Sequence, residues 1–167
     1  MKFYVIIIFM RRRCSEKRHI NPDRKFNNVL FSKFINKVML NGKKSIAERI
    51  CYESVENGAK KQNVEPLAYF EKVIENVAPK KKVVLRRFGG NTYSVPKEIK
   101  VEERPLRAIT IIVKTFRDLA FSQGKPCTVV LTELLNQSYE NLGAAVSAKE
   151  KLHKTADLNQ AFAHFSW

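Results

Sequence analysis

Cysteine is scarce in this sequence, and its three copies stand far apart. Without a CxxC pair, neither a disulfide framework nor a zinc knuckle is predicted, and a reducing compartment is favoured. The three histidines are equally scattered, so their spacing predicts no metal site. Arrangements of Ser-His-Asp, Cys-His or paired carboxylates are missing too, so the sequence predicts neither an enzyme nor a cofactor site. The cysteines are Cys14, Cys51 and Cys127.

Long apolar runs are also missing. The run from Phe3 to Met10 has eight residues, whereas a membrane-spanning helix needs about 20. A secretory signal carries its positive charge before the apolar stretch, but here Arg11, Arg12 and Arg13 follow it, so export is not predicted. A transit peptide, a short extension before a start at Met10 and a role in packing all stay open. No membrane partner is predicted.

Acidic residues are few, at 16 against 31 lysines and arginines, which gives a net charge of +15. Such an excess indicates a polyanionic partner. The charge is uneven: residues 1–18 carry six basic residues and one acidic residue, residues 80–107 carry nine and three, and residues 110–145 are neutral. Two basic clusters around a neutral apolar part favour a binding surface over an ordinary solvated face. The 167 residues, 44% of them hydrophobic, suffice for one domain with a core.

Apolar residues recur at steps of three and four along most of the chain, which is typical of amphipathic helices. A capping box of Ser45 and Glu48 marks the start of the second helix, and Gly58 marks its end. Pro66 and Pro79 bound the third helix, and Gly143 closes the fifth. The predicted helices cover residues 26–39, 45–58, 66–79, 105–121, 126–142 and 144–161.

The pattern changes to β-branched and aromatic residues on both sides of Gly89 and Gly90, which predicts a β-hairpin over about 82–99. Pro96 excludes a central strand, so we expect the hairpin to stand free at an edge. The predicted fold is therefore mainly α, a single six-helix domain over 19–167 with a protruding two-stranded β-ribbon arm. Residues 1–18 form an N-terminal extension and a basic extended tail.

Two basic segments offer candidate contacts. Lys43 and Lys44 follow Gly42 in a turn that does not match a phosphate-loop motif but suits a backbone phosphate at a helix start; a solvated turn is the alternative. In the arm, adjacent arginines can fork to phosphates, while Phe88 and Tyr93 either stack on splayed bases or pack across the hairpin. His164, among apolar neighbours, is predicted to be packed rather than catalytic.

Several stretches together resemble a known family. Asn-Gly-Lys-Lys-Ser-Ile-Ala occupies 41–47, Arg-Arg-Phe-Gly-Gly-Asn-Thr-Tyr-Ser-Val-Pro occupies 86–96, and Asn-Gln-Ala-Phe-Ala-His-Phe-Ser-Trp ends the chain. With Glu-Asn-Val-Ala-Pro at 75–79 and Lys-Leu-His-Lys at 151–154, they resemble small-subunit ribosomal protein seven, of the bacterial and organellar type, from about Met10 onward. The resemblance implies a structural protein of the small ribosomal subunit, with no enzyme activity.

The resemblance also implies partners. Such a protein binds the 3′ major domain of small-subunit rRNA directly and nucleates assembly of the subunit head. It borders the exit site, near its tRNA and mRNA, beside head and platform proteins that include ribosomal protein eleven. The RNA-binding residues that carry over are Arg11, Arg12, Arg13, Lys17 and Arg18 in the tail, Lys43 and Lys44 in the turn, Arg86, Arg87, Gly89 and Gly90 in the arm, and Lys149, Lys151 and His153 in the last helix.

Some positions depart from the family pattern. An Arg-Trp pair is missing from Ala108-Ile109-Thr110-Ile111, and basic runs are reduced around 117–119 and 147–149. RNA contact is expected to be weaker there. This erosion and the apolar N-terminus favour an organelle, a mitochondrion or plastid, over the bacterial cytoplasm.

Three other functions fit the composition. A basic β-ribbon on a helical body also suits an architectural DNA binder. An RNA-modifying enzyme needs a cofactor loop or an acid–base pair, neither of which is found. A membrane-surface protein anchored by Phe3 to Met10 ranks last.

Overall fold

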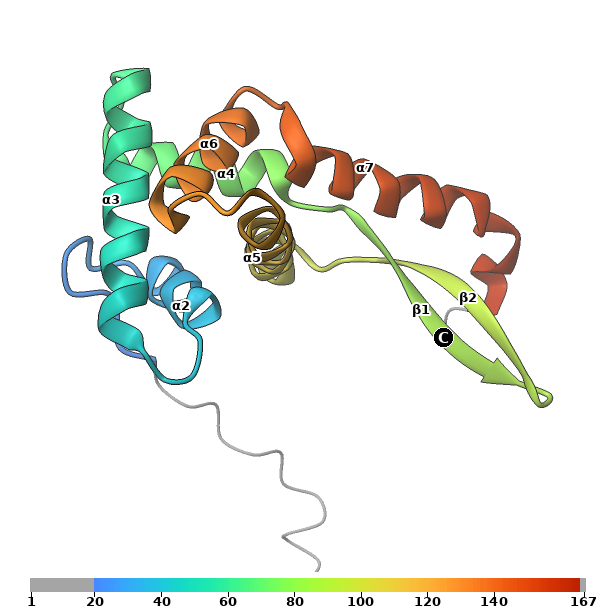
Figure 1. The fold of residues 1–167 in the computed structure, drawn as a ribbon. Coiled ribbons are helices and arrows are strands. Elements are labelled where there is room, and N and C mark those ends of the chain that lie inside the picture. The colour runs from blue at the N-terminus through green and yellow to red at the C-terminus, as the bar shows by residue number, and fades with distance from the viewer. Residues whose placement is uncertain (1–19, 166–167) are drawn as a thin grey trace, which may run out of the picture.

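A computed structural model describes residues 20–165, and this range folds into a helical body with one β-hairpin (Figure 1). The mainly α fold with a β-arm is confirmed. The predicted extension and tail, residues 1–18, lie outside the described range. The elements in it are α2 (Val29–Val38), α3 (Lys44–Gln62), α4 (Pro66–Val77), β1 (Lys81–Phe88), β2 (Asn91–Glu98), η1 (Val101–Glu103), α5 (Arg104–Gln123), α6 (Cys127–Tyr139), α7 (Gly143–Leu158) and η2 (Gln160–Phe165).

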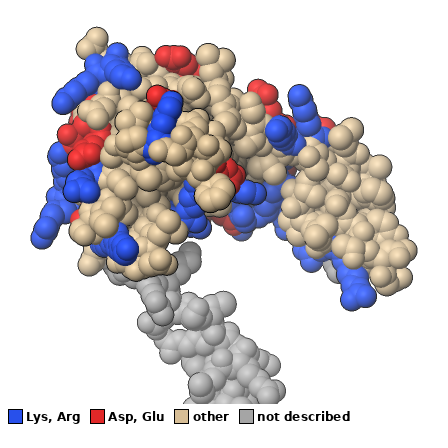
Figure 2. All heavy atoms as spheres, in the orientation of Figure 1, with Lys and Arg blue, Asp and Glu red and all other residues tan. Residues whose placement is uncertain are grey.

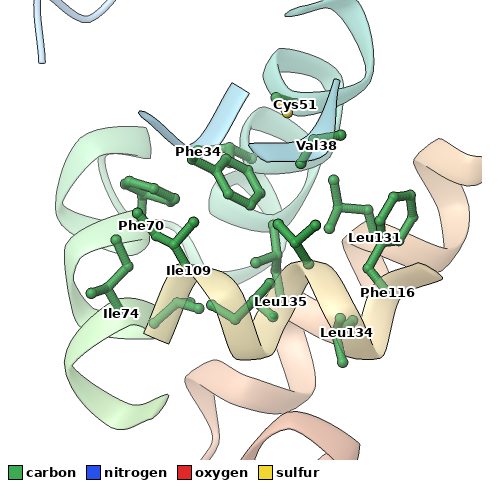
Figure 3. Packing of buried hydrophobic residues seen from close by; sticks show 14 of the residues in the cluster. Phe34, Val38, Cys51, Phe70, Ile74, Ile109, Phe116, Leu131, Leu134 and Leu135 are labelled. Atoms are coloured by element: carbon green, nitrogen blue, oxygen red, sulfur yellow. The ribbon is translucent and has the colours of Figure 1, made fainter. Parts of the chain in front are cut away.

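The core lies along α5, which packs against α2, α4 and α6, while α3 closes the body against α6 (Figures 1 and 3). Its largest side chains are aromatic. The Phe70 ring of α4 lies 5.0 Å from that of Phe31 and 5.3 Å from that of Phe34, measured between centroids. Ile109 and Leu131 are also fully buried. The apolar stripes identified in the sequence therefore meet in one cluster, as amphipathic helices require.

Two predictions about α3 are wrong. Its N-cap is Lys43, and no side chain caps its first turn, so Ser45 forms no capping box. The helix also continues past Gly58 to Gln62. Gly58 serves packing instead of termination, because a Cβ there would lie 2.6 Å from the Oη of the buried Tyr69. Asn63, in the left-handed conformation with φ of 52°, ends the helix instead.

The last two helices end earlier than predicted. α6 stops at Tyr139 because the chain turns back there, with Asn141 in a left-handed conformation and the Leu142 amide donating to the Gln137 carbonyl at 2.8 Å. α7 stops at Leu158, and the tighter helix η2 follows it. This break turns the C-terminal segment back toward the arm, where it packs (Figure 1).

The arm is an antiparallel ribbon that projects from the body beside α7 (Figure 1). Gly89 and Gly90 connect the strands, with φ of 56° and 87°. Two successive residues with positive φ define a type I′ turn, which favours glycine at both positions. Lack of space is not the reason for the glycines, because a Cβ at either position would meet nothing within 4 Å. Contrary to the prediction, the arm does not stand free along its length, because β1 lies against α7 and β2 against η2.

Candidate nucleic-acid interface

Basic side chains dominate the surface near the arm. In the space-filling view, lysine and arginine lie where the body meets the arm, with some acidic side chains among them, and along the lower edge of the arm (Figure 2). The view also shows that this part of the molecule is hollowed between body and arm. An excess of positive charge on a concave surface attracts a polyanion.

The two arginines of the arm point to opposite faces. Arg86 lies opposite Tyr93 in the ladder, and Arg87 lies opposite Thr92. Since side chains alternate along a strand, Arg86 shares a face with Phe88 and Tyr93, while Arg87 lies on the other. Both arginines are exposed. A nucleic acid on one face of the arm therefore meets one guanidinium, and engaging both requires RNA at the edge or around the tip.

The aromatic residues of the arm pack against the C-terminal segment. The Phe88 ring lies 5.3 Å from Phe165, and the Tyr93 ring lies 5.4 Å from Phe162 and 5.3 Å from Phe165. The sequence predicts two roles for these rings, base stacking and packing across the hairpin, and this arrangement is neither of them. Sequence reasoning missed both partner phenylalanines, although their spacing of three residues in an apolar stretch was a usable signal. We infer that these contacts hold the arm in place.

His164 differs from its prediction. It lies between the two phenylalanines, Phe162 and Phe165, that cover the arm, yet its own side chain is exposed. His164 is therefore not buried as a packed histidine would be, although its ring lies 4.0 Å from that of Phe165.

The turn before α3 presents two exposed cations, as predicted. Asn41 and Gly42 take left-handed conformations with φ of 51° and 74°, which leads Lys43 and Lys44 into the helix start. Lys44 lies 3.8 Å from Glu48, one helical turn away, a solvent-exposed pair of small energy. Because no side chain caps the first turn, its amides and the two ammonium groups suit a phosphate.

Two of the three candidate residues of α7 form hydrogen bonds to other segments of the protein. The Lys149 ammonium donates to the Asn76 carbonyl at 2.6 Å, near the C-terminal end of α4, where cations are favourable. The Nε2 atom of His153 accepts from the Lys80 amide at 3.0 Å. Lys151 is exposed. For all three residues RNA binding stays a prediction, and two of them already join α7 to neighbouring segments.

An ion pair supports the base of the arm. Lys81 at the start of β1 lies 2.7 Å from Asp157 of α7, and the carboxylate raises the pKa of the lysine. Lys82 pairs with Glu103 at 3.4 Å. Both pairs are solvent-accessible, so each contributes little energy by itself. They join the first strand of the arm to α7 and to η1.

His153 makes the base of the arm sensitive to pH. Burial and then the Lys149 charge lower the pKa of His153 below its ordinary 6.5, against an opposing effect of Asp157. The folded protein therefore binds this proton more weakly than the unfolded chain, and stability present above pH 6.5 is lost as the pH falls toward the folded-state pKa. Protonation also removes the acceptor for the Lys80 amide.

We expect hydrogen exchange at the Lys80 amide, corrected for intrinsic rates, to accelerate as the pH falls below 6.5. The variant His153→Gln cannot take up a proton and should lose this acceleration. An identical pH dependence in both proteins would contradict the role of His153.

Two of the three departures from the family pattern lie on α5, and the third, around 147–149, lies on α7. Thr110, where the family has arginine, donates its hydroxyl to the Leu106 carbonyl at 2.9 Å within its own helix. Arg117 donates to the Lys37 carbonyl at the end of α2 at 2.7 Å. The cation at position 110 is therefore missing, and the guanidinium of Arg117 joins α5 to the end of α2. The expectation of weaker RNA contact from this helix stays a prediction.

Within residues 20–165, no group of three or more histidines, cysteines or acidic residues is placed to hold a metal ion. In the same range no helix is both long and apolar enough to span a bilayer. The five arginines and lysines proposed in the tail, Arg11 to Arg18, lie outside the described residues.

A helical body with a basic arm and a basic turn is typical of the class of proteins that bind nucleic acid through surface cations. A family model described as ribosomal protein S7p/S5e matches residues 10–160. The chain belongs to this family, and the resemblance stated from the sequence is confirmed. It is thus a structural protein of the small ribosomal subunit that acts in translation, and RNA binding is a general property of the family.

Several curated relatives match almost end to end. The small ribosomal subunit protein uS7 of Pseudothermotoga lettingae is 42% identical over 95% of this chain and 100% of its own length. That of Thermosipho melanesiensis is 43% identical over the same shares. The protein uS7A/uS7B of Bartonella bacilliformis is 40% identical over 94% and 99%. These relatives are bacterial and lend no support to an organelle, so that location stays a prediction.

Proposed function

We propose that this chain binds the 3′ major domain of small-subunit rRNA directly and nucleates assembly of the subunit head. It then borders the exit site, near its tRNA and mRNA, with ribosomal protein eleven as a neighbour. The observation that carries the proposal is the arm: two exposed arginines on a ribbon that α7 and η2 hold against the body. Family membership supports it.

The chemistry of binding is ionic and geometric. Each lysine or arginine that meets an rRNA phosphate releases a condensed counterion, which supplies affinity without reading sequence. Selectivity comes from the spacing of the cations, because folded RNA presents its phosphates at fixed positions. The helical body sets the distance between the turn before α3 and the arm, and the tail residues Arg11, Arg12, Arg13, Lys17 and Arg18 add contacts to this scaffold.

The double variant Arg86→Ala, Arg87→Ala tests the role of the arm. With a folded 3′ major domain fragment, the slope of log affinity against log salt should fall by about 1 to 2, since each lost phosphate contact contributes about 0.9. A filter-binding titration between low and moderate salt measures this slope.

The matched control is Lys60→Ala, Lys61→Ala, which removes two adjacent exposed cations from α3, away from the arm. This control should change the slope less than the Arg86→Ala, Arg87→Ala variant does. If both double variants lose the same slope, binding reflects net charge alone.

The alternative of an architectural DNA binder is separated by competition. Duplex DNA and an unrelated structured RNA of equal length should displace the rRNA fragment poorly at moderate salt. Equal competition by all three would reduce the chain to a general polyanion binder and contradict the proposal.

A further inference from the structure

A groove lies on the body where α2, α4, η1 and the start of α5 meet. Its volume is about 380 Å³, within the range of about 300–1,000 Å³ found for ligand pockets. Val101, at one wall, is 72% exposed although it is aliphatic. The groove thus leaves apolar surface in water. Its apolar lining consists of Leu30, Ile74, Ala78, Val101 and Pro105.

One wall of the groove is acidic in a chain of net charge +15. Glu71 and Glu75 stand one turn apart on α4, and both are exposed. Among residues 20–165 no cation pairs with either carboxylate; Glu71 only accepts from the Asn28 amide group, at 3.4 Å. These two charges are therefore available to a partner.

Lys80 and Arg104 also line the groove. The Nε atom of Arg104 donates to the Ile99 carbonyl at 3.2 Å, which holds the guanidinium against its own chain. An occupant thus meets the two carboxylates of α4, two cations of which one is engaged with its own chain, and several apolar side chains.

We propose that this groove docks a short extended segment of a neighbouring protein, one that places an aliphatic side chain on the floor and basic residues against Glu71 and Glu75. RNA is the poorer occupant, because the two carboxylates repel phosphates and because one of the two cations in the lining, Arg104, is already held by the Ile99 carbonyl. An apolar centre with a charged rim is the usual anatomy of a protein interface. The inference goes beyond rRNA binding, since it concerns a different surface and a partner of opposite charge.

The test uses the full chain and a fluorescent peptide of about eight residues that alternates lysine and leucine, a length within the ordinary range of an extended strand. Fluorescence anisotropy should show saturable binding even though the protein and the peptide are both cationic. The variant Glu71→Gln, Glu75→Gln should bind about three- to tenfold more weakly, which is the contribution of two exposed ion pairs.

The control variant is Glu53→Gln, Glu150→Gln, which makes the same charge change at exposed glutamates of α3 and α7. It should bind the peptide as the original protein does. A peptide with serine in place of leucine keeps the charge. It should bind at least about tenfold more weakly, because the burial of leucine side chains is lost.

The proposal is overturned if the lysine–leucine peptide does not bind, if both glutamine variants weaken it equally, or if the serine peptide binds as well. Affinity for the 3′ major domain fragment is measured on the same proteins. It should not fall in either glutamine variant, so failure of the groove and failure of rRNA binding are distinguishable.

Discussion

Replacing Phe162 and Phe165 together by alanine should weaken binding to the rRNA fragment by about tenfold or more. Three ring contacts join these residues to Phe88 and Tyr93 of the arm, and each aromatic pair contributes about 0.5–1.5 kcal/mol. Without them the arm must lose conformational freedom when it binds, which costs affinity. The measurement is a titration of the rRNA fragment at fixed salt.

The control for this variant is Gln160→Ala, which changes an exposed residue of the same short helix η2. It should bind RNA normally. Circular dichroism should show intact helices in both proteins, because neither phenylalanine belongs to the buried cluster of the body. An unchanged affinity in the double phenylalanine variant would mean that the C-terminal segment does not position the arm.

The second large effect is on stability. Phe70→Ala should lower the free energy of unfolding by about 3–5 kcal/mol, the usual cost of emptying a buried aromatic site. Phe70 is 1% exposed, and its ring contacts those of Phe31 and Phe34. Figure 3 shows Phe70 on the side of the core that faces Phe34. Since domains of this size are stable by only about 5–15 kcal/mol, urea unfolding should show a much lower midpoint.

Phe121→Ala is the matched control, because it removes the same ring from a position that is 95% exposed. Its unfolding free energy should stay within about 0.5 kcal/mol of the original. Equal losses in the two variants would show that the body is not organised around the Phe70 cluster.

The local parts of the fold were predictable from the sequence. Periodic apolar residues located all six helices of the described range, and Gly89-Gly90 between β-rich stretches located the arm. These signals act over a few residues, so the sequence carries them directly. The helix ends were less predictable: Gly58 resembled a terminator, although its role is to make room for Tyr69, a residue from the next helix.

The supports of the candidate site were not predictable, because they join segments far apart in the chain. The contact of Phe88 with Phe165 and the hydrogen bond from Lys80 to His153 each depend on how α7 lies beside the arm. A pattern of residue types identifies Lys149 and His153 as polar and basic, but not that they are engaged within the protein. The candidate interface thus came from the sequence as a set of residues, and the structure supplies their arrangement.

The most direct test of the account is chemical footprinting of the isolated 3′ major domain with this chain as the only protein. The account predicts a defined set of protected nucleotides at moderate salt, and the Arg86→Ala, Arg87→Ala variant should lose part of that set while the rest remains. Protection that appears only after other head proteins are added, or that spreads evenly over the RNA, would contradict direct and selective binding.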